Sequence, residues 1–104
     1  MSFNVLFLAH SPDADPAMHR SIINTGKYKL FTVVVRNQAQ ALEIAKSMTK
    51  EQGLDSILLC PGFTHSDVAE IFESLNRQVG VCVARGDGLS NQISIQARQR
   101  AYGN

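Results

Sequence analysis

Short apolar runs and amphipathic stretches alternate along this chain of 104 residues. Four runs are rich in apolar and β-branched residues and have the length of strands: Phe3 to Ala9, Tyr28 to Arg36, Leu54 to Cys60 and Val79 to Ala84. The first run is apolar at nearly every position, which is typical of a strand buried on both faces of a parallel sheet. The pattern therefore predicts four strands separated by helical segments.

The segment between the first two strands carries a helix-start signal. Asp15 can accept hydrogen bonds from free backbone N–H groups, and Pro16 suits the first turn of a helix. Gly26 is suited to the end of a helix. We therefore predict a short helix that runs from Pro16 to about Asn24.

Two later segments combine capping residues with helical spacing. Between Asn37, which can cap a helix, and Gly53, which can end one, apolar residues recur at spacings of three and four on one face. Thr64 and Asp67 have the spacing of a capping box, with Asp in place of the usual Glu. These signals predict a second helix after the second strand and a third helix from Thr64 to Leu75.

The tail from Ser90 onward fits two patterns. Ile93, Ala97 and Ala101 recur at helical spacing, whereas Ile93, Ile95 and Ala97 alternate as in a strand. We favour the helix and leave the strand as the alternative.

Strands that alternate with helices favour a parallel sheet with helices on both faces, and right-handed crossovers restrict its topology. We therefore predict a single α/β domain spanning residues 1–104. Its expected architecture is a small three-layer sandwich around a four-stranded parallel sheet in the flavodoxin-like or Rossmann-like order 2-1-3-4.

In this order the second strand lies at an edge of the sheet. It carries an apolar run from Val33 to Val35, and Lys29 and Arg36 are its charged residues. Bare apolar edges invite pairing with another chain, and symmetric homo-oligomers are the commonest way to cover them. A homo-oligomer is therefore expected; the alternative is that the C-terminal tail covers this edge.

Composition excludes several classes of partner. Hydrophobic residues make up 44% of the chain and charged residues 18%, as in an ordinary globular protein, and the formal net charge is +1. Without a basic excess or a Trp, neither nucleic acid nor a membrane surface is an expected partner. No apolar run approaches the roughly 20 residues that span a bilayer.

The N-terminus lacks the features of a signal peptide. Cys60 and Cys82 lie in or beside apolar strands, which is the pattern of packed, reduced thiols rather than of a disulfide framework. Cys82 in particular is expected in the core, because it lies between Val81 and Val83 in the fourth predicted strand. A cytoplasmic location is expected.

Chemically useful side chains follow the predicted strands at one rim of the sheet. Open α/β sheets bind ligands at the carboxyl ends of their strands, where the strand order reverses, which here is between the first and third strands. The residues expected on this rim are His10, Asp13, Asp15, Arg36, Cys60, His65, Arg85 and Asp87.

Two histidines on this rim are the candidates for proton transfer. Because an imidazole ordinarily titrates near neutral pH, His10 and His65 can act as general acid or base, while Asp13 can orient a histidine or hold a metal. We assign these three residues as the candidates for catalysis. In the simpler alternative, the aspartates of the first loop only cap backbone N–H groups.

An anion can be held by the same rim. Arg85 and Arg36 can clamp a phosphate or carboxylate, and Gly62 and Thr64 lead into a helix N-terminus with free N–H groups. Alternatively, the capping box already satisfies those groups. Cys60 can be a nucleophile activated by a neighbouring imidazole, but a packed thiol at the end of a strand is the interpretation we favour.

Three segments of the chain are distinctive: Leu8 to Pro16, which contains HSPDADP, Leu58 to His65, which reads LLCPGFTH, and Val83 to Gly88, which reads VARGDG. Together they resemble a family of short microbial α/β proteins of unknown function. The resemblance extends over essentially the whole chain. It implies no activity, substrate or cofactor.

The sequence thus favours a small protein that binds a polar or anionic small molecule at the rim of its sheet. The alternatives are a non-catalytic homo-oligomeric interaction module and a metal-dependent hydrolase that uses His10 and His65. Whether the protein is an enzyme, and whether it holds a metal or another cofactor, stay open at the level of sequence.

Overall fold

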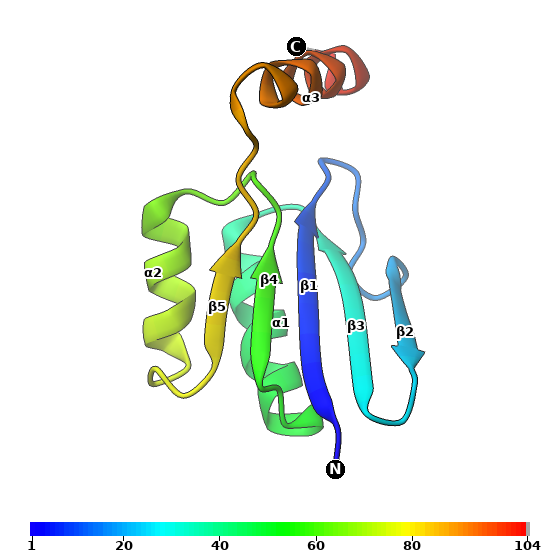
Figure 1. Ribbon diagram of the computed structural model, residues 1–104, viewed down its shortest axis with the longest axis vertical. Helices are drawn as coiled ribbons and strands as arrows, with labels where there is room; N and C mark the ends of the chain where they lie inside the picture. The colour runs from blue at the N-terminus through cyan, green and yellow to red at the C-terminus, as the bar shows by residue number, and fades with distance from the viewer. Residues whose placement is uncertain (104) are drawn as a thin grey trace.

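A five-stranded sheet forms the body of the protein (Figure 1). The computed structural model describes residues 1–103. The strands are β1 (Phe3–His10), β2 (Arg20–Asn24), β3 (Tyr28–Val35), β4 (Ser56–Leu59) and β5 (Gly80–Val83). They lie in the order β2-β3-β1-β4-β5, with β2 antiparallel to β3 and every other neighbouring pair parallel.

The prediction of a purely parallel, four-stranded sheet is therefore wrong. The sheet has a fifth strand, and its overall order differs from 2-1-3-4. The four predicted strands do exist, and among themselves they lie as β3-β1-β4-β5. Because β2 pairs with β3, the edge that was expected to be bare is covered by the chain's own hairpin, and not by the C-terminal tail.

The predicted helix from Pro16 to about Asn24 is also wrong. The Asp15 carboxylate does accept a hydrogen bond from the N–H of Ala17, and the Asp15 carbonyl accepts two more, but the result is a single turn. The chain then enters β2, whose residues pair with Lys29–Val33 across a tight hairpin. The β-branched Ile22 and Ile23 suit this strand, so long-range pairing outweighs the local helix-start signal.

The other predicted helices are confirmed. They are α1 (Gln38–Gln52), α2 (His65–Ser74) and α3 (Gly88–Tyr102). The Asn37 side chain caps α1, and Gly53 ends it. Thr64 and Asp67 form the expected capping box at the start of α2. None of the helices within residues 1–103 is both long and apolar enough to cross a membrane.

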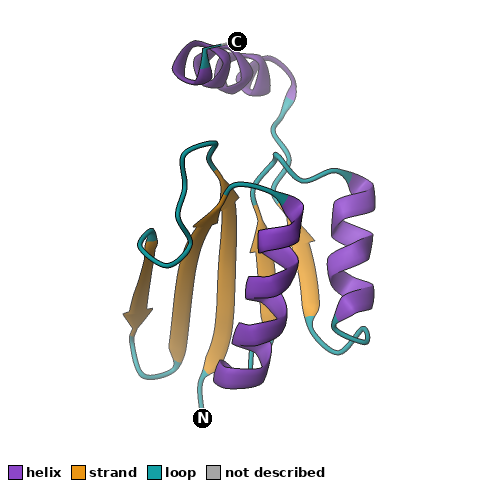
Figure 2. Ribbon diagram, turned by 180° about the vertical axis from the view of Figure 1, so that it is seen from behind, coloured by secondary structure: helices purple, strands orange, loops and turns teal. Residues whose placement is uncertain are grey.

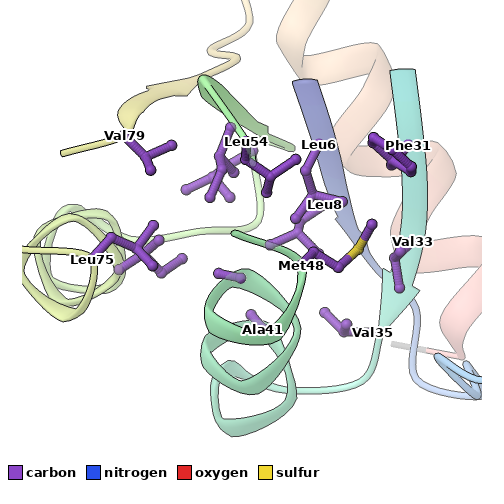
Figure 3. Close-up of a cluster of buried hydrophobic side chains, with 14 of the residues drawn as sticks. Leu6, Leu8, Phe31, Val33, Val35, Ala41, Met48, Leu54, Leu75 and Val79 are labelled. Carbon is purple, nitrogen blue, oxygen red and sulfur yellow. The ribbon is translucent and has the colours of Figure 1, made fainter. Parts of the chain in front are cut away.

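Helices α1 and α2 lie against the same face of the sheet (Figure 2). The hydrophobic core fills this one interface, where Leu6 and Leu8 of the central strand β1 meet Ala41 and Met48 of α1 and Leu75 at the end of α2 (Figure 3). The expected three-layer sandwich is wrong, because the crossover from β1 to β3 contains a strand in place of a helix.

The opposite side of the sheet is uncovered by any helix of the described residues, and we call it the open face. Successive side chains of a strand point to opposite sides, so the residues that alternate with the core residues along each strand lie on the open face. Its residues are Phe3, Val5, Phe7, Ala9, Ser21, Ile23, Tyr28, Leu30, Thr32, Val34, Ser56, Leu58, Gly80 and Cys82.

Candidate functional site

The carboxyl ends of β1 and β4 mark the topological switch point of the sheet. From β1 the chain continues toward β3 on one side, and from β4 it continues to β5 on the other. Crevices at such points are where open α/β sheets bind ligands. The predicted location of the switch point, between the first and third predicted strands, is confirmed.

His10 and Cys60 meet at this point. His10 is the last residue of β1, and Cys60 extends the β4 ladder by donating its N–H to the carbonyl of Leu8 at 3.0 Å. The Cys60 Sγ lies 3.9 Å from the His10 Nδ1, and both side chains are half-buried. The imidazole stacks on the buried ring of Phe63, with ring centroids 4.0 Å apart. Two strand ends and one loop therefore fix the position of the imidazole.

Gly62 makes room for this arrangement. A Cβ atom at this position would lie 2.9 Å from the His10 Nδ1 and 3.6 Å from the Cys60 Sγ. The first distance is shorter than side-chain packing tolerates, so the close approach of the loop to the imidazole requires glycine. The predicted ligand-binding residue Gly62 thus borders His10 directly.

Burial sets the charge of the imidazole. Desolvation lowers the pKa of His10 below its ordinary value of 6.5, and the negative charge of Asp67 opposes this only in part. At neutral pH His10 is therefore an uncharged base. A neutral imidazole beside a thiol can accept its proton, which is the arrangement that activates a cysteine nucleophile.

Arg85 reaches the same loop. Its Nη1 donates a hydrogen bond of 3.2 Å to the carbonyl of Pro61, between Cys60 and Gly62. The guanidinium is exposed and keeps other donors for an anion. The sequence-based assignment of Arg85 to this rim agrees with that contact.

The structure places Asp13 on the first loop among Ser11 and His19, and not among the residues that contact His10. Its carboxylate accepts a 2.5 Å hydrogen bond from the Ser11 hydroxyl, which is the main reason that the pKa of Asp13 is lowered. Asp13 and His19 line a hollow of about 320 Å³. Nearby, Arg36 donates to the carbonyl of Ala14 at 2.8 Å, so its guanidinium braces the loop.

His65 and Thr64 have other surroundings. Thr64 is occupied as the N-cap of α2, where its hydroxyl accepts from the N–H of Asp67 at 3.1 Å. His65 is exposed and lines a hollow of about 250 Å³ between α2 and β5, together with Phe72 and Val81 among others. His10 instead contacts Cys60, Gly62 and Phe63, so the expected pairing of the two histidines finds no support.

Within residues 1–103, no group of three or more His, Cys, Asp or Glu side chains is arranged to hold a metal ion. The metal-dependent hydrolase remains a prediction for which these residues offer no ligand set.

Sequence reasoning did not identify His10 as the neighbour of Cys60, and it misplaced Cys82. Cys60 packs against the core at the end of a strand, as favoured, but it is only half-buried and also borders His10. The prediction that these two strands are parallel neighbours was the available signal for the contact between His10 and Cys60, because parallel neighbours end side by side. Cys82 was expected in the core, which is wrong: it is exposed on the open face, since no helix covers that side of β5.

These features define a small α/β protein with a histidine–cysteine pair at the switch point of a mostly parallel sheet. A family model described as a family of unknown function (DUF6506) matches residues 3–97, and the chain belongs to this family. The resemblance to a family of unknown function is thereby confirmed. Neither the comparison with curated proteins nor that with solved structures finds a match.

Proposed function

We propose that the protein binds a small polar or anionic molecule at the carboxyl rim of its sheet, against His10 and Cys60. The observation that carries this proposal is the meeting of the two side chains at the switch point, 3.9 Å apart, with Gly62 leaving the imidazole unobstructed. A structural role alone does not require a base and a thiol at this position.

Charge favours a ligand with acceptor oxygens. Arg85 donates a hydrogen bond to the loop beside His10, at Pro61, and the N-cap of α2, Thr64, follows three residues later. Guanidinium groups and helix N-termini both favour carboxylates and phosphates. Asp67 opposes an anion, but its carboxylate is engaged by the N–H of Thr64 at 2.9 Å.

The chemistry that the pair supports is proton transfer at His10. The neutral imidazole accepts a proton from the ligand or from the Cys60 thiol, and Cys60 can then act as a nucleophile. In this proposal Asp13 and His65 are outside the reacting group. The free thiols of Cys60 and Cys82 also suit a cytoplasmic location.

A thermal-shift screen of purified protein against phosphates, nucleotides and carboxylates tests this function. A ligand of the folded state raises the melting temperature, because binding at 100 times the Kd adds about 2.7 kcal/mol to stability. We expect His10→Ala to lose the shift and His65→Ala, an exposed control, to keep it. A shift that survives in His10→Ala contradicts the proposed site, and so does a panel that leaves the wild-type protein unmoved.

A non-catalytic homo-oligomeric module is the second candidate. The open face favours it, because apolar side chains such as Phe3 and Leu58 are 50% and 39% exposed there. An oligomer whose stability responds to no compound of the screen supports this alternative.

A further inference from the structure

The open face is an apolar surface that no helix within residues 1–103 covers, and the first loop borders it at Val34, where Asp13 and His19 lie. The ladder register sets Phe7 beside Leu58 on one side and Thr32 on the other, and Leu58 beside Cys82. None of its residues is charged. In a doubly wound sheet, a helix would lie on this face.

Helix α3 is the complementary feature. It has 15 residues, and none of them is buried. Leu89 and Ile93 are 86% and 70% exposed, and Ala97 and Ala101 continue the same stripe at a spacing of four. Helices of this length are marginal in water when they stand alone, so α3 needs a surface on which to pack.

The chain holds α3 away from its own sheet. The helix lies beyond the carboxyl ends of the strands (Figure 1), and the molecule measures 41 Å along its longest axis against 26 and 24 Å across. Asn91 of α3 folds over Gly86, where a Cβ atom would lie 2.6 Å from the Asn91 Cβ. Arg85 ties the same connection to Pro61. Both contacts lie in or beside the connection from β5 to α3 and favour the observed position of the helix.

We propose that two copies of the chain form a dimer by exchanging α3, so that the stripe from Leu89 to Ala101 of each copy lies on the open face of the other. The second copy is the occupant that the structure favours, because it supplies a helix that buries none of its residues and lies beyond the end of its own sheet. Arg100 lies on the same face of the helix, three residues after Ala97 and seven after Ile93, near the end of the helix, where its long side chain can extend to water.

The dimensions of the two surfaces agree. A helix of 15 residues is about 22 Å long, and strands of eight residues such as β1 and β3 span about 26 Å. Two exchanged helices, each about 10 Å wide, remove on the order of 1,000 Å² from water, which is the lower bound for a specific interface. Exchange of an identical element is a low-cost route to a dimer.

The oligomeric mass of the full chain is the first test. Light scattering after gel filtration is expected to give twice the mass of one chain for the wild-type protein. Ile93→Arg is expected to give a monomer, and Gln99→Arg, which adds the same charge on another side of α3, is expected to remain a dimer. A monomeric wild-type protein, or a dimeric Ile93→Arg variant, overturns the exchange.

A mixing experiment separates exchange from other dimers. Ile93→Arg damages the helix and Leu58→Arg damages the open face, so each homodimer would contain two defective contacts. A heterodimer of the two variants contains one intact contact, between the wild-type α3 and the wild-type open face. We therefore expect the mixture to dimerise at least tenfold more tightly than either variant alone, with circular dichroism confirming that both are folded.

Two results would contradict the proposal. A dimer that Leu58→Arg breaks and Ile93→Arg leaves intact would mean that the two open faces pack directly. Two variants that stay monomeric when mixed would mean that α3 is not exchanged. Should Leu58→Arg fail to fold, Cys82→Arg on the same face replaces it in both measurements.

Discussion

Gly62 shows how a single backbone position controls the candidate site at the scale of one residue. An added methyl group would have to displace the His10 imidazole, which is stacked on the ring of Phe63. The ring cannot move without losing either the stack or its contact with Cys60. The geometry of the pair therefore depends on the absence of a side chain.

We expect Gly62→Ala to lower the free energy of unfolding by roughly 1–3 kcal/mol, the usual cost of overpacking. Gly80→Ala is the matched control, because its Cβ would make ordinary contact with the Ser56 Oγ at 3.6 Å. Urea unfolding of both variants measures the difference. Equal losses in the two variants would mean that the approach of the loop to His10 is not constrained.

The lowered pKa of His10 predicts a pH dependence of stability. The unfolded imidazole gains a proton near pH 6.5, whereas the folded imidazole gains it only at a lower pH. The stability of the folded protein is therefore complete above pH 6.5 and falls as the pH drops from 6.5 toward the folded pKa. His10→Gln should flatten this part of the profile, and His19→Gln should not. Urea titrations at several pH values check this, and an unchanged slope in His10→Gln would contradict it.

The alkylation rate of Cys60 tests the proposed action of His10 on the neighbouring thiol. We expect His10→Ala to slow alkylation of Cys60 by iodoacetamide severalfold at pH 7.5, because it removes the base that takes up the thiol proton. Cys82 is the internal control, since no imidazole borders it on the open face. Peptide mass spectrometry follows both sites; an equal change at both would indicate an indirect effect.

At the scale of elements, the helices that sequence could predict are those whose ends are fixed locally. Asn37 and Gly53 bound α1, and the Thr64–Asp67 capping box opens α2, so neighbouring residues alone determine these boundaries. The segment after Asp15 could not be predicted in this way. Its helix-start signal forms only a single turn. The conformation of the following residues is determined instead by the pairing of β2 with β3 in a hairpin.

Loss of the α2 cap should be measurable at this scale. Thr64→Ala removes the acceptor for the Asp67 N–H, and we expect it to cost about 1 kcal/mol of unfolding free energy. Ser66→Ala, an exposed substitution in the same turn, is the control and should cost less than half of that. Chemical denaturation measures both; a cost at Thr64 no larger than that at Ser66 would mean that the cap contributes nothing.

At the scale of the whole molecule, the alternation of strands and helices was enough to predict the parallel strands and the switch point. It could not predict the layers, because a single crossover without a helix exposes one face of the sheet. The same limit applies to the site. His10 was identified from its place at a strand end, and the strand that carries Cys60 was correctly placed beside it. Which side chain of the following loop contacts the imidazole depends on the path of that loop, and the strand order does not determine that path.

An exchanged dimer makes stability depend on protein concentration. Because α3 packs only in the assembly, dilution favours the unfolded chain, and we expect the melting temperature of the wild-type protein to rise steadily between 1 and 100 µM, roughly the range in which such mass action is measurable. Ile93→Arg should abolish this dependence. A wild-type melting temperature that is constant over this range would argue against the dimer.

The stack of His10 on Phe63 gives the candidate site a spectroscopic label of its own. Protons of an imidazole held over a benzene ring are shielded by its ring current, so the carbon-bound ring protons of His10 should resonate upfield of those of the exposed His19 and His65. One set of displaced signals would then report, without any added probe, both the protonation of His10 and the arrival of a ligand beside it.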